Sequence, residues 1–498
     1  MQDGPSGSTG DQPLAGKRLV VTSFDLQQQE HRGIAVYSKA LLRALKQSGA
    51  EIWLLTDFDP PIRDSSLKRA AGPVKQLVYE ARVLHSLAKG YGGPLSPWAA
   101  VRTISENKCL RRLLGVWLGF RDLGDRLKRR RSYDLDQLKK IHLHQIVDSP
   151  YQRLERLKYF DDLDGLIGAR YLYLNAFREA LAKPPKPVTL RLGGFDALIT
   201  TAPMNLKVNG VMVQTIHDMI PLEYVETTDH IGIFHQRMLM AKAARRVFVS
   251  RSSEQKYNRT YGEQTEHSGL CIVQPPSLEV PQRNSRRILN QDLISLPSRK
   301  QGGEKQLTSF QYILFNSSIE PRKNLLPVIK AYQLSGLPAL GIRFCITGQL
   351  KRDSYSKQVA KHADSNVILT GYVDESLKTS LFLNSLMVVS PSLVEGFGIP
   401  VMDAACLGIP VLASPSESHR EIQELYDFST YVRLCDARSP ACWGEAMDAL
   451  AQREQRRISN LGNQAERDRR LARYQDCASR VFEKFRQDLC SQILRENH

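Results

Sequence analysis

Short apolar runs alternate along the chain with stretches whose apolar residues recur at helical spacing. The runs are bounded by glycine, proline and polar residues, which is typical of strands buried on both faces of a parallel sheet. They lie at residues 17–22, 51–55, 196–199, 211–216, 246–250, 312–315, 343–347, 366–370, 386–389 and 409–413. Strands that alternate with helices predict an α/β protein with parallel sheets.

The stretch 386–414 shows this pattern most completely. The apolar run at 386–389 predicts a buried strand, and residues 390–398 predict a loop. Pro400 stands where proline is accepted in the first turn of a helix, and Gly408 stands at the position of a C-cap glycine. A turn that opens a helix at the carboxyl end of a parallel strand is where doubly wound α/β folds bind anions and nucleotides.

Two carboxylates lie eight positions apart in this stretch, at Glu395 and Asp403. The first would lie at the loop tip and the second about two turns into the helix, so both can face one crevice. Gly396 and Gly398 let the backbone approach a ligand closely, because they carry no Cβ. These residues predict a site for a polyol or a nucleotide. The alternative is an ordinary strand–loop–helix connection with a glutamate at the helix entrance.

The segment 391–404, PSLVEGFGIPVMDA, resembles the signature of the family 4 retaining glycosyltransferases. The resemblance implies that Glu395 lies at the donor sugar and that the second carboxylate binds the ribose hydroxyls. It also implies that Gly396, Phe397 and Gly398 belong to the nucleotide-sugar-binding loop. The chain departs from the family at the second carboxylate, because Asp403 is one methylene shorter than the usual glutamate. We still expect Asp403 to bind the ribose.

A second part of the resemblance follows the apolar run at 312–315. The residues NSSIEPRKN at 316–324 are similar to the diphosphate-binding loop of the family. Arg322 and Lys323 stand directly before a predicted helix, whose amino end also favours anions. The resemblance implies that these two cations carry the charge of the donor diphosphate.

Three further candidates lie in the N-terminal half of the chain. His217 follows the strand at 211–216, and the resemblance places it near the donor sugar, with Asp218 either orienting the imidazole or capping a turn. Gly33 resembles the glycine beside the donor diphosphate, although a plain helix-entry glycine would look the same. Ser250 stands at a helix entrance that can face phosphate, and N-capping alone also explains it.

The resemblance implies two Rossmann-like doubly wound domains that face a cleft, the GT-B fold. Residues 17–285 are expected to form the acceptor-side domain, with a basic helical insertion at about 62–187. A linker at 286–309 leads to the nucleotide-sugar-binding domain at 310–475. The last residues, 476–498, are expected to form a helix that crosses back onto the first domain.

Composition and charge indicate the binding partners and the cellular compartment to expect. The formal net charge of +17 favours an anionic partner. Nine Lys or Arg residues fall within 107–131, and a basic amphipathic helix there can dock on an anionic membrane surface or pack within its own domain. The eight cysteines contain no CxxC pair, which indicates buried thiols in a reducing cytosol.

The ends and the hydropathy of the chain bear on its location. Residues 1–16 predict a disordered tail rather than a signal peptide. No run approaches the ~18 apolar residues that a membrane span requires. We therefore expect a cytoplasmic protein, with peripheral attachment to the inner face of the membrane as a further option.

The resemblance implies a retaining hexosyltransferase that moves a hexose from a sugar nucleotide to a growing glycan or a lipid-linked acceptor. The segment SIEPRKN at 318–324 and the His217–Asp218 pair look most like those of mannosyltransferases of bacterial polysaccharide assembly, which favours GDP-mannose as the donor substrate. No cofactor, no metal and no nucleic-acid partner are expected, because Arg322 and Lys323 take over the neutralisation of the diphosphate and no nucleic-acid motif is recognised. The alternatives are a sugar-nucleotide epimerase or phosphorylase of the same fold, and a catalytically silent glycan- or nucleotide-binding module.

Overall fold

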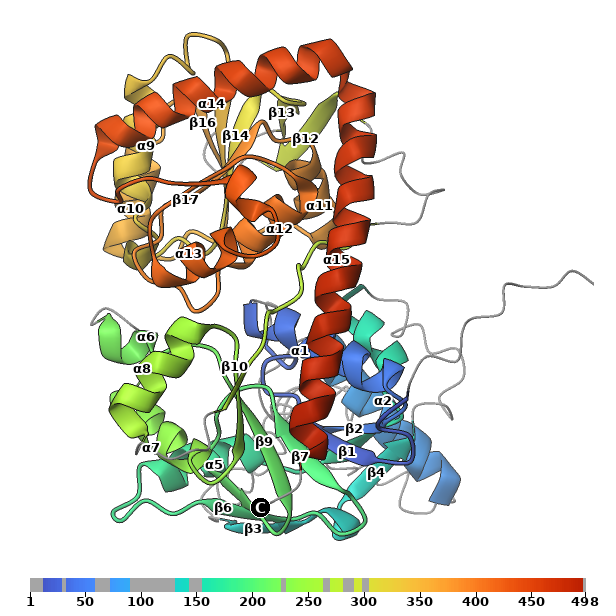
Figure 1. The fold of residues 1–498 in the computed structure, drawn as a ribbon. Coiled ribbons are helices and arrows are strands. Elements are labelled where there is room, and N and C mark those ends of the chain that lie inside the picture. Colours follow the sequence, from blue (N-terminus) through green and yellow to red (C-terminus); the bar gives the residue numbers. More distant parts are fainter. Residues whose placement is uncertain are drawn as a thin grey trace, which may run out of the picture.

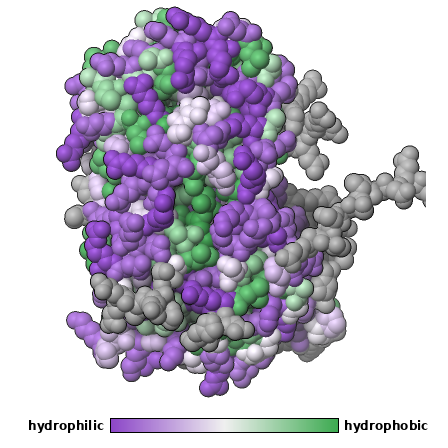
Figure 2. All heavy atoms as spheres, in the orientation of Figure 1, coloured by the Kyte–Doolittle hydropathy of each residue, from purple (hydrophilic) through white to green (hydrophobic). Residues whose placement is uncertain are grey.

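The computed structural model describes residues 12–28, 33–58, 72–89, 130–142, 155–224, 230–262, 269–280, 291–297 and 304–495. These residues form two lobes, each built around a sheet of mostly parallel strands, and the long helix α15 (Asn463–Leu494) runs along both lobes (Figure 1). The predicted pair of Rossmann-like domains is therefore confirmed. Figure 2 shows the same face as mainly hydrophilic, with a narrow hydrophobic band at the junction of the lobes.

The N-terminal lobe contains an eight-stranded sheet in the order β11-β10-β9-β7-β1-β2-β5-β4. Its neighbouring strands are parallel except for β4, which is antiparallel to β5. A smaller parallel sheet has the order β3-β6-β8. The strands are β1 (Arg18–Thr22), β2 (Glu51–Thr56), β3 (Ser132–Asp134), β4 (Lys139–His142), β5 (Gly165–Gly168), β6 (Val188–Arg191), β7 (Ala197–Thr200), β8 (Leu206–Val208), β9 (Val211–Ile216), β10 (Arg245–Phe248) and β11 (Leu270–Cys271). The helices are α1 (Gly33–Gln47), α2 (Gly72–Lys89), α5 (Leu172–Ala180), α6 (Ile220–Glu223), α7 (Ile231–Ala241) and α8 (Arg251–Tyr261).

The C-terminal lobe contains a six-stranded parallel sheet in the order β16-β15-β14-β17-β18-β19, and an antiparallel pair, β12-β13. The strands are β12 (Leu293–Pro297), β13 (Glu304–Thr308), β14 (Tyr312–Asn316), β15 (Arg343–Thr347), β16 (Val367–Gly371), β17 (Met387–Ser390), β18 (Val411–Ala413) and β19 (Val432–Leu434). Before α15 the helices are α9 (Leu325–Leu334), α10 (Ser354–His362), α11 (Glu375–Leu383), α12 (Ile399–Leu407), α13 (Glu417–Gln423) and α14 (Pro440–Leu461).

The segment expected as a helical insertion, 62–187, proves to supply strands of the sheets. Strand β5 lies inside the segment and pairs in parallel with β2, so it belongs to the main sheet. Its sequence, GLIG, is short and begins with Gly165, whose missing Cβ leaves room for the ring of Trp53. Glycine weakens the apolar signal of a strand, which explains why the pattern did not predict it. Of the basic stretch at 107–131, only the last two residues are described.

The crossing between the lobes lies earlier than the expected linker at 286–309. The main-chain N–H of Ile272 still donates to Phe248 of β10, in the N-terminal lobe, whereas Ser277 already contacts the C-terminal lobe. The described residues of the expected linker instead form the β12–β13 pair. The connection between the lobes is therefore a short extended segment rather than a long loop.

Helix α15 begins at Asn463, earlier than the expected start of the crossing helix at 476. Its first half packs on α12 and α11 of the C-terminal lobe, and its second half packs on α1 and β10 of the N-terminal lobe. The ring of Phe485 meets Tyr37 of α1 edge to face at 5.8 Å, and the Gln492 amide donates to the carbonyl of Arg246 at 2.9 Å. In the part of the chain that is described, no helix has both the length and the apolar character that crossing a bilayer demands.

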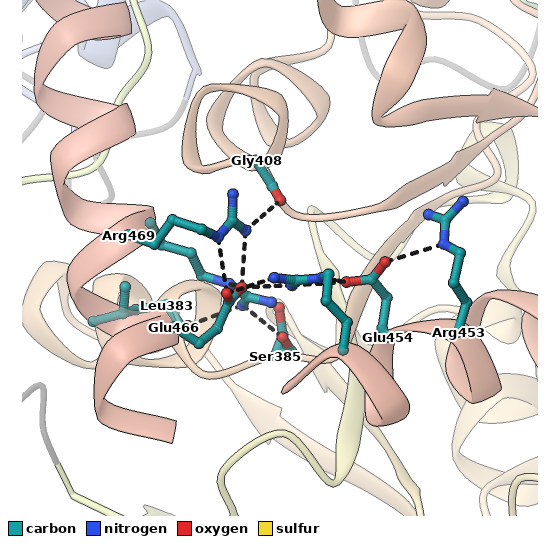
Figure 3. A network of polar contacts seen from close by, with 9 residues as sticks. Leu383, Ser385, Gly408, Arg453, Glu454, Glu466 and Arg469 are labelled. Atoms are coloured by element: carbon teal, nitrogen blue, oxygen red, sulfur yellow. Dashed lines mark hydrogen bonds and ion pairs between the residues drawn. The ribbon is translucent and has the colours of Figure 1, made fainter. Parts of the chain in front are cut away.

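A buried ion network holds the corner between α14 and α15 (Figure 3). Glu466 is fully buried and accepts hydrogen bonds from Arg457, Arg469 and Arg470. Arg470 is also fully buried, and its Nη1 donates to two main-chain carbonyls at the end of α11 and just beyond it. Burial alone would raise the pKa of Glu466, but the three cations hold it well below its ordinary value. The carboxylate therefore stays ionised and anchors α15 to the C-terminal lobe.

We predict that Glu466→Gln lowers the free energy of unfolding by about 3–5 kcal/mol, because it leaves the Arg470 guanidinium buried without its counter-ion. Glu483→Gln is the matched control, since Glu483 is half exposed on the same helix and also binds an arginine. It should change stability by less than about 1 kcal/mol. Urea unfolding followed by circular dichroism measures both variants, and equal small effects would contradict the anchoring role.

Candidate functional site

A cavity of about 360 Å³ lies between the two lobes. The C-terminal lobe lines it with residues that follow β14, β15, β16 and β17, and the N-terminal lobe lines it from the end of β9 and the start of α1. Both parallel sheets therefore point their carboxyl ends at one cleft, the usual ligand position in this fold class. Nine of the ten predicted site residues line this cavity: Gly33, His217, Arg322, Lys323, Glu395, Gly396, Phe397, Gly398 and Asp403.

The loop between β17 and α12 has the predicted construction. The strand ends at Ser390, and α12 begins at Ile399 with Pro400 in its first turn. Gly398 precedes the helix with a φ of 107°, and Gly408 ends it with a φ of 69°. Both values lie in the region that favours glycine, so these positions need that residue for their backbone conformation. The strand–loop–helix–strand prediction for this stretch is confirmed.

Glu395 lies at the centre of the site, and its side chain is 11% exposed. Its two carboxylate oxygens bind two cations of the neighbouring loop: Oε1 accepts from Lys323 Nζ, and Oε2 accepts from Arg322 Nη1 at 3.3 Å. Burial raises the pKa of Glu395, but Lys323 and Arg322 outweigh it and lower the pKa to about 2. Burial is also the main cause that lowers the pKa of Lys323. We conclude that Glu395 carries a full negative charge at neutral pH.

A second carboxylate and a third cation extend this cluster. Glu320 accepts a hydrogen bond from Arg322 Nε at 3.1 Å and another from Lys351 Nζ at 2.7 Å. Burial raises the pKa of Glu320, but the combined effect of Lys351 and Arg322 is larger, so the pKa lies below its ordinary value. Lys351 follows β15, as Arg322 and Lys323 follow β14, and the sequence interpretation missed it. A cation just beyond the end of a core strand is the signal that could have found it.

Asp403 also lines the cavity, but the protein itself occupies its carboxylate. Both oxygens accept hydrogen bonds from Ser277 of the interlobe crossing, one from the main-chain N–H and one from the hydroxyl at 2.6 Å. Burial raises the pKa of Asp403 to about 6, against the opposing effect of Lys378. A ribose at this place would therefore have to share the carboxylate with Ser277 or displace the serine.

Lys378 and Glu375 of α11 lie beside this pair and were not predicted from the sequence. They form an ion pair at 2.5 Å, and Lys378 Nζ lies 3.5 Å from the hydroxyl of Ser277. Both residues line the cavity. Their i, i+3 spacing on a helix is common on solvated surfaces, so it gave no sign of a site.

His217 is held by a carbonyl rather than by the neighbouring aspartate. Its Nε2 donates to the carbonyl of Thr201 at 2.7 Å, and the ring of Tyr37 meets it edge to face at 4.9 Å. Burial lowers the pKa of His217, which favours the neutral imidazole. Asp218 instead accepts from the main-chain N–H of Ile220 at 3.0 Å. Of the two roles considered for Asp218, the structure shows the turn cap.

The lobes touch at the site. A Cβ on Gly396 would lie 2.7 Å from the carbonyl oxygen of His217, so only glycine permits the C-terminal loop to come this close. A Cβ on Gly33, at the start of α1, would lie 3.5 Å from Ile399. The Glu395 loop and the His217 segment therefore form one surface although they belong to different lobes.

Ser250 is the predicted site residue that does not line the cavity. Its hydroxyl caps α8 by accepting from the N–H of Ser253 at 3.1 Å. The main-chain N–H groups of Arg251 and Ser252 at the start of this helix do bind an anion. That anion is the carboxylate of Glu421 on α13, which accepts from Arg251 N at 2.8 Å and from Ser252 N at 2.7 Å. The N-capping interpretation therefore accounts for Ser250, and the helix amino end joins the two lobes.

The described residues include no group of three His, Cys, Asp or Glu side chains that could hold a metal ion. The cationic side chains of Arg322, Lys323 and Lys351 are instead gathered at one end of the cavity, beside Glu320 and Glu395. Asp218, which also lines the cavity, interacts electrostatically with Arg322, so the three cations are balanced by carboxylates of the protein. An anionic ligand at this end of the cavity would compete with these carboxylates for the three cations.

We predict a pH dependence of stability from Asp403. Its pKa is about 6 in the folded protein and 3.8 ordinarily, so the folded state binds the proton more tightly. The free energy of unfolding should therefore fall by ~3 kcal/mol as the pH rises from about 4 to about 6, and this contribution should not change above that range.

Asp403→Asn should remove this part of the pH dependence, whereas Asp468→Asn, at an exposed position of α15, should leave it in place. Thermal unfolding of the wild type and both variants at several pH values from 4 to 7 provides the comparison. Parallel curves for the wild type and Asp403→Asn would show that the carboxyl titrates normally.

Comparison with known proteins finds a family match in the C-terminal lobe. Residues 300–467 match the family model described as glycosyl transferases group 1. O-antigen chain mannosyltransferase B of Escherichia coli is 29% identical over 121 residues, which are 24% of this chain and 32% of that protein. The serotype-specific mannosyltransferase WbdA of Escherichia coli is 33% identical over 120 residues, which are 22% of this chain and 14% of that protein. The matched parts thus span about a third or less of these relatives.

The fold has counterparts over almost the whole chain. The crystal structure of Anabaena Alr3699/HepE in complex with UDP and glucose superposes with a TM-score of 0.50 at 10% identity, covering 95% of this chain and 100% of that chain. At this identity the likeness concerns the architecture alone. Residues 300–467 are therefore similar to the glycosyl transferases group 1 family, and they lie within a two-lobed fold of the GT-B type.

Proposed function

We propose that this protein is a retaining glycosyltransferase of family 4, which moves a hexose from a sugar nucleotide to a growing glycan or a lipid-linked acceptor in cell-surface polysaccharide synthesis. We propose mannose as the hexose and GDP-mannose as the donor. One observation carries the proposal: Lys323, Arg322 and Glu395 meet in a cavity between two Rossmann-like lobes. The matching segments of two mannosyltransferases support the choice of mannose.

Cleavage of the anomeric bond separates two charges, and the site has a group for each. Negative charge grows on the diphosphate as it leaves, where Lys323, Arg322 and Lys351 are already fixed in position. Fixed cations stabilise such charge without reorganisation at the moment of reaction. In the absence of donor these cations are paired with Glu395 and Glu320, so the bound phosphates compete with the two carboxylates for them. The same cations would take over the role that a divalent metal has elsewhere, so we propose that no metal cofactor is needed.

Positive charge grows on the sugar ring, and the loop that contains Glu395 is suited to it. The Glu395 carboxylate is ionised, and the carbonyl oxygen of His217 lies against Gly396 of the same loop. Both are negative or partly negative groups beside the expected sugar position. Transfer with retention forms the new bond on the face from which the diphosphate departs, and the departing phosphate oxygen takes the proton of the acceptor hydroxyl. Contact between the lobes excludes water and so limits hydrolysis of the donor.

The proposal extends to where the protein works. Lipid-linked acceptors lie at a membrane, and the formal net charge of +17 favours contact with an anionic surface. We therefore propose a cytoplasmic protein that attaches peripherally to the inner face of the membrane. The basic stretch at 107–131 is the proposed contact.

The donor can be identified by thermal unfolding in the presence of sugar nucleotides. We predict that GDP-mannose raises the melting temperature, whereas UDP-glucose, UDP-N-acetylglucosamine and ADP-glucose at equal concentration do so less, because a ligand stabilises by mass action according to its affinity. Lys323→Ala should abolish the shift. Lys330→Ala, an exposed lysine of α9, should leave it intact. A larger shift with a UDP-sugar would replace the donor but keep the reaction class.

The catalytic role of the acidic loop can be tested by Glu395→Gln. We predict that transfer from GDP-mannose falls by about 10²–10³-fold, the usual loss when one charge-stabilising group is removed. Proton NMR of the product formed by the wild type should show the anomeric configuration of the donor. Circular dichroism verifies that the variant is folded, since the change leaves Lys323 buried without its partner. Unchanged transfer by the folded variant, or an inverted product, would reject the proposed mechanism.

A further inference from the structure

The crossing between the lobes, residues 272–278, forms part of the cavity wall and runs beside α15 (Figure 1). It leaves the N-terminal lobe at Ile272, whose main-chain N–H donates to the carbonyl of Phe248 at 2.8 Å. Two residues of the crossing, Gln274 and Ser277, line the cavity, and neither was predicted as a site residue. The crossing is therefore a wall of the site as well as a connection between the lobes.

Gln274 contributes an unused hydrogen-bond donor to this wall. The residue is 2% exposed, and its Nε2 has no hydrogen-bond partner in the described part of the chain. A buried amide group without a partner costs stability, so such groups are rare in folded proteins and each one requires an explanation. A ligand in the cavity that offers an acceptor oxygen would supply the missing bond.

Ser277 occupies an acceptor on the same wall. Its main-chain N–H and its hydroxyl donate to the two carboxylate oxygens of Asp403, and Lys378 Nζ lies 3.5 Å from the same hydroxyl. Two hydroxyl groups on neighbouring carbon atoms present the same pair of donors to a carboxylate. Acidic side chains bind ribose hydroxyls in this way in doubly wound folds. In the free protein, Ser277 therefore takes a place that a diol of a ligand can occupy.

The contact of Ser277 with the carboxylate is separate from the contacts that attach the crossing to the C-terminal lobe. The carbonyl of Leu278 accepts from the hydroxyl of Tyr474 at 3.0 Å. The carbonyl of Glu279 accepts from the hydroxyl of Thr379 at 3.2 Å. These two bonds involve neither Ser277 nor its partner. A ligand can therefore replace the serine on the carboxylate while the following residues stay attached.

We propose that the crossing is part of the sugar-nucleotide site, where Gln274 and Asp403 together bind a cis-diol of the ligand. This inference rests on the proposed function. Gln274 Nε2 donates to a hydroxyl oxygen, and the two hydroxyls donate to the carboxylate of Asp403 in place of Ser277. A hydroxyl suits both partners, because it accepts one hydrogen bond and donates another. The ribose and the mannose of GDP-mannose each carry a cis-diol, and the experiment distinguishes them.

The test measures binding of GDP, 2′,3′-dideoxy-GDP and GDP-mannose by isothermal titration calorimetry. The wild type is compared with Gln274→Met, which keeps the length of the side chain and removes the amide donor. If the ribose supplies the diol, the Kd for GDP should rise by about 3- to 10-fold, the effect of one neutral hydrogen bond. The Kd for 2′,3′-dideoxy-GDP should then stay within about twofold of the wild type. A rise confined to GDP-mannose assigns the diol to the mannose.

Two further readouts separate ligand binding from a packing role. Without ligand, Gln274→Met should melt at the temperature of the wild type or above it, because the change removes a buried donor that has no partner. Ser277→Ala should lower the Kd for the same ligand by about 2- to 5-fold, because it weakens the group that competes for the carboxylate. Gln475→Met, at an exposed position of α15, is the matched control and should equal the wild type in every measurement.

Equal affinities of the wild type and Gln274→Met for all three ligands would overturn the inference. Equal losses for GDP and 2′,3′-dideoxy-GDP, with no further loss for GDP-mannose, would also overturn it, because the effect would not depend on hydroxyls. Weaker binding by Ser277→Ala would contradict the exchange. If the wild type binds a UDP-sugar instead, the corresponding uridine nucleotides replace the guanosine ones. If the wild type binds no sugar nucleotide, the proposed function itself fails, and this inference fails with it.

Discussion

The buried ion pair between Glu395 and Lys323, reinforced by Arg322, is the interaction on which the site depends. A carboxylate and an ammonium taken out of water together cost several kcal/mol each, and only their mutual attraction makes burial tolerable. The pair is therefore poorly stabilised as a purely structural feature, and apolar side chains would pack the same space at lower cost. In the proposed reaction, a donor diphosphate would give the cations a new partner and would leave the carboxylate to face the sugar. Without a ligand, the two charges neutralise each other inside the cavity.

The site is formed by both lobes, so it requires the lobes to keep their relative position. Three contacts hold that position. Helix α15 is anchored to the C-terminal lobe by Glu466 and reaches the N-terminal lobe at Phe485 and Gln492. The carboxylate of Glu421 caps the amino end of α8 across the junction. Ser277, in the crossing itself, is tied to Asp403 in the middle of α12.

The sequence was most informative where a single segment contains the whole signal. The loop around Glu395 could be predicted with its strand, glycines and helix, because each of these features is encoded by neighbouring residues. The long-range pairs could not be predicted in this way. Ser277 and Asp403 are far apart in the chain, and the serine has no local signal of a site. Strand β5 was missed because its first residue, Gly165, has no apolar side chain to signal a strand. The space that a Cβ would need there is filled by the ring of Trp53.

The two sides of the cleft differ in how far the sequence reveals them, and the physical demands on each side explain the difference. The proposed diphosphate site uses cations at a helix entrance, so two consecutive residues, Arg322 and Lys323, already indicate it in the sequence. On the N-terminal side of the cleft, the strand order of the sheet brings the lining residues into place. His217 follows β9, and only in the folded chain does its carbonyl lie against Gly396 of the other lobe.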